Sequence, residues 1–152
     1  MRKNLFRGKT KEGKWVYGGY YETECCDGDG LCSFIKINGV SNGVKITHET
    51  VGQFTGLTDK NGVKIFEGDV LEKETYMVNA FTGKKVDNSE HKAIYAVLSD
   101  VYGNYLINIK DIGTDTEKSF MRKRANYIQM ITDESHIIGN IHDNPELLEE
   151  EC

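Results

Sequence analysis

The 152-residue sequence has a single proline and no long hydrophobic run. A transmembrane helix needs about 20 consecutive apolar residues, so the sequence offers no membrane span. The opening residues, MRKNLFRGKTKEG, also lack the apolar stretch of a secretory signal. We therefore expect a cytoplasmic protein of a bacterial host cell, with no membrane partner.

Cysteine is scarce as well, and the spacing of the four cysteines does not predict a disulfide framework. Cys25 and Cys26 are adjacent, Cys32 follows six residues later, and Cys152 is the last residue. Zinc sites usually need two ligand pairs at CxxC-type spacing, which is missing even if His48 is counted as a ligand. We expect reduced thiols, as in a reducing cytoplasm, and no metal.

Motifs of the common enzyme classes are absent. The sequence has no GxSxG elbow, no phosphate-binding loop before a helix and no pair of histidines at metal-ligand spacing. The strings DGDG and DKNG share only part of the calcium-loop pattern, without its final glutamate. We expect no catalytic residue, no cofactor and no enzymatic activity.

One enzymatic alternative is kept, in which Glu67 and Asp69 act together. These residues alternate along the chain, so in an extended segment their carboxyl groups could lie on one face and share acid–base work. The structural interpretation is that Gly68 makes a tight turn, Asp69 accepts hydrogen bonds from nearby backbone N–H groups, and Glu67 stays solvated. We favour the structural interpretation.

Glycine is abundant, with 16 residues placed mostly between short apolar and aromatic runs. This punctuation is typical of turn-rich β proteins, and Asn-Gly pairs indicate tight hairpins. We predict a mainly β fold with strands near residues 5–7, 14–22, 33–38, 44–47, 51–55, 63–66, 69–73, 93–98, 105–110, 127–131 and 135–141. Residues 74–92 are predicted as a long hairpin tip or mobile loop, and 111–126 as loop or short helix. Asn144 as N-cap and Pro145 at the first position predict a short helix over 145–150.

Two segments carry a specific pattern. TGLTDKNGVKIFEGDVL, at residues 55–71, combines TGL, a DKNG-type turn and I-[YF]-EGD-[IV]. IIGNIHDNPELLEE, at residues 137–150, contains IGNI followed by NPELL. Together they resemble the YopX family of phage and prophage proteins. The resemblance marks signature positions for which we expect structural roles: Gly56, Asp59, Asn61, Gly62, Glu67, Gly68, Asp69, Gly139, Asn140, Asn144 and Pro145.

The resemblance implies a β-rich fold in a family with no established biochemical activity. It suggests a single domain, residues 1–152, with two parts. Residues 1–68 form an N-terminal β-hairpin part, and residues 69–152 form an SH3-like small barrel with the short C-terminal helix. It supplies no catalytic, cofactor-binding or metal-binding residue.

The net charge of −5 and a pI near 5.4 weaken any proposal of non-specific nucleic-acid binding. Arg122, Lys123 and Arg124 nevertheless form a basic stretch close to Tyr127, and cations beside an aromatic ring suit single-strand stacking. A nucleic-acid-binding small barrel is therefore an alternative. We favour a non-enzymatic accessory protein that binds a host or phage protein or assembles with itself, because exposed sheet edges pair readily unless guarded.

Overall fold

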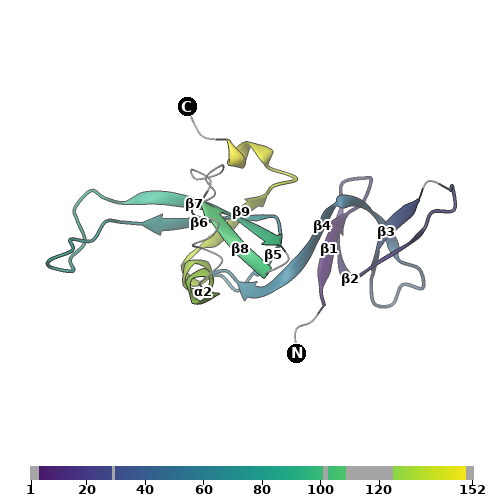
Figure 1. The fold of residues 1–152 in the computed structure, drawn as a ribbon, viewed down its shortest axis with the longest axis horizontal. Coiled ribbons are helices and arrows are strands. Elements are labelled where there is room, and N and C mark those ends of the chain that lie inside the picture. The colour runs from purple at the N-terminus through teal and green to yellow at the C-terminus, as the bar shows by residue number, and fades with distance from the viewer. Residues whose placement is uncertain (1–3, 29, 101–102, 109–124, 150–152) are drawn as a thin grey trace. The chain divides into compact units, whose positions relative to one another are not determined.

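The computed structural model describes residues 4–28, 30–100, 103–108 and 125–149 (Figure 1). The chain divides into two compact units, Met1–Gly56 and Leu57–Cys152. Most of the described residues lie in β-strands, which confirms the prediction of a mainly β protein. None of the helices in the described ranges has the length and apolar character needed to cross a membrane.

The first unit is a small ring of antiparallel strands. Its strands are β1 (Phe6–Lys9), β2 (Trp15–Glu24), β3 (Leu31–Lys36) and the greater part of β4 (Val44–Thr58). Neighbours in sequence pair with one another, and β1 also pairs with β4, so the four strands close on themselves. The buried core consists of Val16, Ile35 and Ile46, with Phe6, Tyr20, Ile37, Val44 and Val51 packed against it.

Strand β2 changes partner in its middle. Its first residues, up to Gly18, pair with β1, and its later residues, from Gly19, pair with β3. A Cβ on Gly18 would lie 2.0 Å from the carbonyl oxygen of Lys36, so only glycine fits this crossing. The change of partner accounts for the shift in apolar alternation at this pair of glycines.

The second unit contains a four-stranded antiparallel sheet in the order β8-β7-β6-β9. The strands are β6 (Asp69–Thr75), β7 (His91–Asp100), β8 (Gly103–Asn108) and β9 (His136–Asn140). A short strand β5 (Lys64–Phe66) pairs with β4, and helix α2 (Ala125–Glu134) precedes β9. The core consists of Ile65, Leu71, Ala93, Tyr95, Val97, Leu106 and Ile131, with Leu57, Ile128 and Ile137 packed against it.

The connection between β6 and β7 extends well beyond the other strands of this sheet as a long hairpin (Figure 1). We call residues 76–90 the arm. A turn at its end is closed by the Asn79 N–H, which donates to the Lys84 carbonyl at 2.8 Å. An isolated β-bridge between Val78 and Lys85 holds the two sides together below that turn. The region predicted as a hairpin tip or mobile loop is thus a hydrogen-bonded hairpin.

Several predicted elements need correction. Residues 127–131 were expected to form a strand but lie in helix α2, because Ile128 and Ile131 are three residues apart and reach the core from one helix face. A short apolar run cannot distinguish the two possibilities by its pattern. The strands predicted at 44–47 and 51–55 are one strand, β4.

The predicted C-terminal helix is a single 3₁₀ turn, η2 (Pro145–Leu148). Asn144 occupies the N-cap position but makes no side-chain capping bond. Its side-chain oxygen instead accepts the Asn140 N–H at 3.4 Å, so the expected cap is a loop contact.

The two compact units meet between Gly56 and Leu57, twelve residues before the predicted boundary of parts at 68/69. Leu57 and Ile65 explain the position, because both pack in the second core. The closed ring of strand pairings lies in the first unit, and the residues from 69 onward form an open strand order. An SH3-like topology for residues 69–152 stays a prediction.

Candidate functional site

Asp59 is the most heavily bonded of the signature residues. Its side chain is only 5% exposed. One carboxylate oxygen, Oδ1, accepts the N–H groups of Asn61 at 2.9 Å and Val63 at 3.0 Å, which fixes the turn that ends at Gly62. The other oxygen, Oδ2, accepts the N–H of Ile137 at 3.1 Å, from strand β9. One carboxylate thus joins the first signature segment to the second.

A second junction lies at Gly68 and Asp69. Gly68 has φ +88°, a conformation that L side chains rarely adopt, and its N–H donates to the Val97 carbonyl at 2.8 Å. The Gly68 carbonyl accepts the Ile141 N–H at 2.9 Å. The Asp69 carboxylate, in a side chain 2% exposed, accepts the Phe66 N–H at 2.8 Å. Glu67 is half-buried. The segment therefore ties the turn to two other strands.

The third junction is the loop after β9. The side-chain oxygen of Asn140 accepts the N–H groups of His142 and Asp143, each at 3.0 Å. A Cβ on Gly139 would lie 2.4 Å from Oδ1 of Asn144, so the close approach of the loop requires glycine. Pro145 then begins the 3₁₀ turn. Gly56, the remaining signature residue, has φ +87° and ends the first unit.

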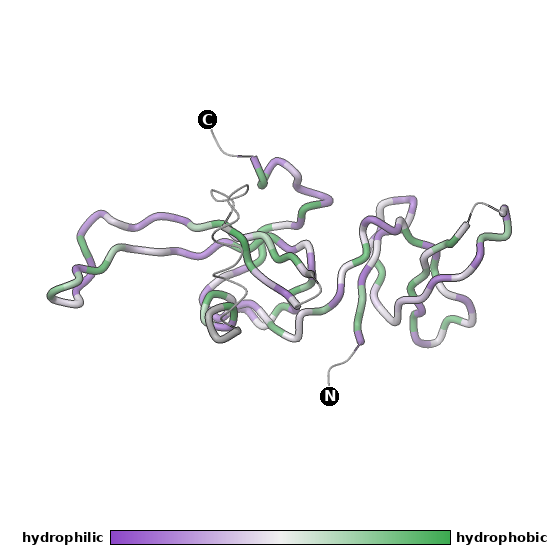
Figure 2. Tube along the Cα trace, in the orientation of Figure 1, coloured by the Kyte–Doolittle hydropathy of each residue, from purple (hydrophilic) through white to green (hydrophobic). Residues whose placement is uncertain are grey.

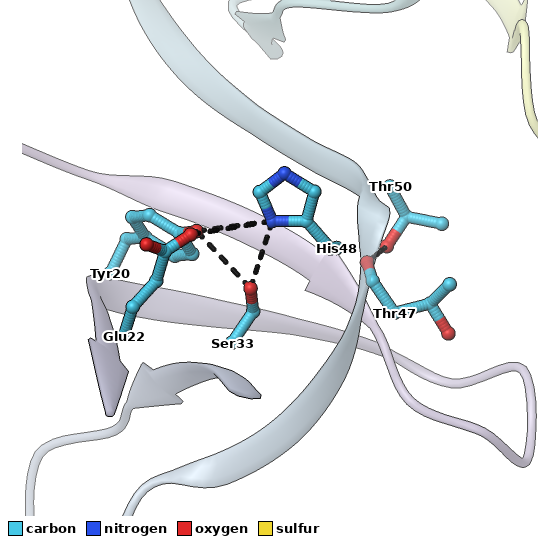
Figure 3. Close-up of polar contacts among 6 residues, drawn as sticks. All are labelled: Tyr20, Glu22, Ser33, Thr47, His48 and Thr50. Carbon is cyan, nitrogen blue, oxygen red and sulfur yellow. Dashed lines mark hydrogen bonds and ion pairs between the residues drawn. The ribbon is translucent and has the colours of Figure 1, made fainter. Parts of the chain in front are cut away.

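A polar cluster of a different kind lies on the first unit (Figure 3). Strand β2 contributes Tyr20 and Glu22, β3 contributes Ser33, and β4 contributes His48. The Nδ1 atom of His48 lies 2.9 Å from the Ser33 hydroxyl oxygen, 3.3 Å from the Tyr20 hydroxyl oxygen and 3.4 Å from Oε1 of Glu22. The Tyr20 hydroxyl also donates to the Glu22 carboxylate. Beside the cluster, the Thr50 hydroxyl donates to the Thr47 carbonyl.

The geometry of this cluster differs from that of a nucleophilic triad. In a triad the nucleophile and the acid bind opposite nitrogens of the histidine. Here all three partners face Nδ1, and Figure 3 shows the other ring nitrogen of His48 turned away from them. Burial and, next, the hydrogen bond to Glu22 raise the pKa of the Tyr20 hydroxyl. The contacts orient the His48 ring on an open strand surface, with the His48 side chain 67% exposed.

Of these four residues, the sequence had drawn attention only to His48, as a conceivable metal ligand. Ser33 and Glu22 carry no motif, and only the strand register, which pairs Glu22 with Ser33, brings them together. Throughout the described ranges, no group of three or more His, Cys, Asp and Glu side chains is placed to hold a metal ion.

The arm presents a third arrangement, an exposed apolar surface. Phe81 at its end is 99% exposed. The turn that carries Phe81 is built by Asn79, whose side-chain oxygen accepts the N–H groups of Phe81 at 2.9 Å and Thr82 at 3.0 Å. The hydropathy trace shows apolar segments on both sides of the arm (Figure 2). The arm's large exposed apolar side chains are Tyr76, Met77, Val78, Phe81 and Val86.

Comparison with known proteins identifies the family. The sequence matches the YopX protein family over residues 5–149. The chain belongs to the YopX family. A crystal structure of protein EF1440 from Enterococcus faecalis is similar over 96% of this chain and 97% of its own, with 20% sequence identity and a TM-score of 0.45. No curated protein matches the sequence.

Membership of the YopX family gives the two signature segments a common context. In this YopX protein they contact each other twice, through Asp59 with Ile137 and through Gly68 with Ile141. They therefore build one structural framework in the second unit. The arm and the polar cluster lie outside both segments, so any function they have is not carried by the signature residues.

The cysteine prediction is wrong for two of the four residues. Cys25 and Cys32 form a disulfide, with their Cα atoms 5.3 Å apart. The reason is the antiparallel pairing of β2 with β3, which places Glu24 opposite Leu31 and so brings the two ends of the connecting loop together. Sequence spacing alone does not show this. Cys26 has an exposed free thiol.

The predicted nucleic-acid contacts are only partly open to description. Arg122, Lys123 and Arg124 lie outside the described residues, and Tyr127 lies in α2 but its side chain is outside the described part as well. Two other lysines that could have joined the same patch are paired with acids. Lys85 forms an ion pair with Glu90, and Lys92 lies 3.1 Å from the Glu72 carboxylate.

Proposed function

We propose that this YopX protein is a non-enzymatic accessory protein of phages and prophages that acts by binding another protein, and that the arm is its contact surface. The observation that carries the proposal is Phe81, a large aromatic side chain 99% exposed at the end of a hydrogen-bonded hairpin. Exposed aromatic anchors are the residues that most often dominate the energy of protein interfaces. The proposed location is the bacterial cytoplasm, where the Cys25–Cys32 pair would be kept mostly as thiols.

The shape of the arm supports binding over a role in folding. Contacts within the arm are mainly polar: the Met77 N–H donates to the Ser89 hydroxyl at 3.0 Å, and that hydroxyl donates to the Val86 carbonyl at 2.6 Å. Its apolar side chains are left facing outward. An apolar surface held in a fixed shape gives affinity at little cost in ordering on binding.

The enzymatic alternative, with Glu67 and Asp69, has less support. The Asp69 carboxylate is buried and engaged by the Phe66 N–H, and Gly68 between the two residues is bonded on both sides to neighbouring strands. These contacts favour the structural interpretation of the segment. The nucleic-acid alternative depends on the basic stretch at residues 122–124, and a strongly salt-dependent affinity would favour it.

Site-specific photo-cross-linking in bacterial cells tests the proposal. A benzophenone amino acid takes the place of Phe81, and in a matched control it takes the place of Leu31, which is 66% exposed on the first unit. We expect protein adducts from position 81 and far fewer from position 31. Equal adduct yields from the two positions, or no adduct from position 81, would refute the arm as the contact surface.

A further inference from the structure

We infer that the partner of the arm is the arm of a second copy of this chain, packed antiparallel to it. The inference rests on the proposed function and names the occupant of the same surface. Three properties of the arm lead to it: charge separation along its length, a self-complementary apolar surface, and a rigid turn.

Charge is distributed unevenly along the hairpin. Residues 76–86, at the outer end, contain Lys84 and Lys85 and no acidic residue. The inner end contains Asp87 and Glu90, and Glu74 lies in the adjoining strand β6. Two arms aligned in the same direction would place lysines against lysines. Two antiparallel arms place the basic end of each against the acidic end of the other, which favours this orientation.

One of these lysines is already engaged within the arm. The Lys85 ammonium pairs with Glu90 and lies 5.1 Å from the centre of the Tyr76 ring. Lys84 and Asp87 are both exposed. Contact between Lys84 of one copy and Asp87 of the other is therefore the charge pairing that an antiparallel arrangement adds.

The apolar side chains suit a two-fold contact, in which the same surface is used by both copies. Tyr76, Met77, Val78, Phe81 and Val86 range from 41% to 99% exposed. Covering them on two arms would remove roughly 1,000 Å² of surface from water, below the 1,200–2,000 Å² of stable complexes. We therefore expect a weak dimer, with a dissociation constant on the order of 10–100 µM.

Sedimentation velocity over a concentration series tests the self-association. The unchanged chain should pass from 17.2 kDa to twice that mass as its concentration rises through the dissociation constant. Phe81→Ser should weaken association roughly 10- to 100-fold, because it removes one buried aromatic side chain on each arm. Leu31→Ser, at an exposed apolar position outside the arm, should leave association unchanged. Circular dichroism confirms that each variant is folded.

Charge exchange tests the antiparallel arrangement. Lys84→Glu and Asp87→Lys should each impair self-association, because each gives the two ends of the arm the same sign. An equimolar mixture of the two variants should associate again, since the acidic outer end of one then faces the basic inner end of the other. A mixture that associates no better than either variant alone would overturn the antiparallel arrangement.

Failure of this inference differs from failure of the proposed function. A chain that stays monomeric at every concentration would overturn the inference. In that case adducts from position 81 with a different protein would still support the binding function. If position 81 gives no adduct at all, the proposed function itself is refuted.

Discussion

Removing the Asp59 carboxylate should destabilise the second unit far more than removing an exposed carboxylate does. The Asp59 carboxylate is buried and accepts three backbone N–H groups, two in its own turn and one, from Ile137, in strand β9. Hydrogen bonds to charged groups contribute about 1.5–3 kcal/mol each, and a buried donor left without a partner carries its own cost. Because the three bonds share one group and do not add fully, we expect Asp59→Ala to cost about 3–5 kcal/mol.

Asp59→Asn should give an intermediate result. The amide keeps one oxygen for the Asn61 and Val63 N–H groups, but its NH₂ then faces the Ile137 N–H, donor against donor. We expect a loss of about 1–3 kcal/mol. Asp133→Ala is the matched control, because its carboxylate is exposed and accepts only the side chain of Gln129, at 2.6 Å.

Two measurements follow the effect. Urea unfolding monitored by circular dichroism gives the change in the free energy of unfolding. Hydrogen exchange measured by mass spectrometry shows whether protection is lost in the peptides that cover the turn and β9 together, as a shared carboxylate requires. If Asp59→Ala unfolds within about 0.5 kcal/mol of Asp133→Ala, the assignment of Asp59 as the junction of the two signature segments is wrong.

Three further predictions concern single groups. Gly139→Ala should cost about 1–3 kcal/mol in thermal unfolding, because its Cβ would overlap Asn144, whereas Gly19→Ala, with open space around the added Cβ, should cost far less. Alkylation of oxidised protein should leave Cys25 and Cys32 unlabelled until a reductant is added, and reduction should lower stability by about 2 kcal/mol; labelling of both without reductant would contradict the disulfide. The pKa of Tyr20, followed by tyrosinate absorbance against Tyr20→Phe, should exceed 10.0 and fall in Glu22→Gln. Because the folded-state pKa is raised, the associated stabilisation is complete below pH 10 and is lost as the pH rises through the folded-state value; an unchanged pKa in Glu22→Gln would argue against the contact.

Local chemistry was the part of this fold that the sequence predicted well. Asp59, Asn61 and Gly62 predicted a turn from the residue types alone, and the structure has that turn with the expected bond from Asp59 to the backbone ahead of it. The bond to Ile137 spans 78 residues, and no local pattern contains it. Helix α2 was missed for a related reason, because Ile128 and Ile131 acquire a helical face only when a core exists to receive them.

The candidate sites depended on tertiary structure to a greater extent. The polar cluster needs the pairing of Glu22 with Ser33 and the return of β4 beside β3, and a strand register shifted by one residue would send these side chains to the other face. The arm looked like a mobile loop because its polar residues hide the signal. Asn79 is the residue that could have revealed it, since an asparagine that bonds the backbone two residues ahead is a known way to build a turn.

Cross-linking from position 81 in living bacterial cells tests most directly whether the arm binds protein through Phe81. We expect discrete protein adducts from a benzophenone at position 81, with few from the control at Leu31, which is also exposed. An adduct at twice the mass of the chain would identify a second copy as the partner. The absence of adducts from position 81, in cells where the protein is folded and abundant, would contradict a binding role for the arm.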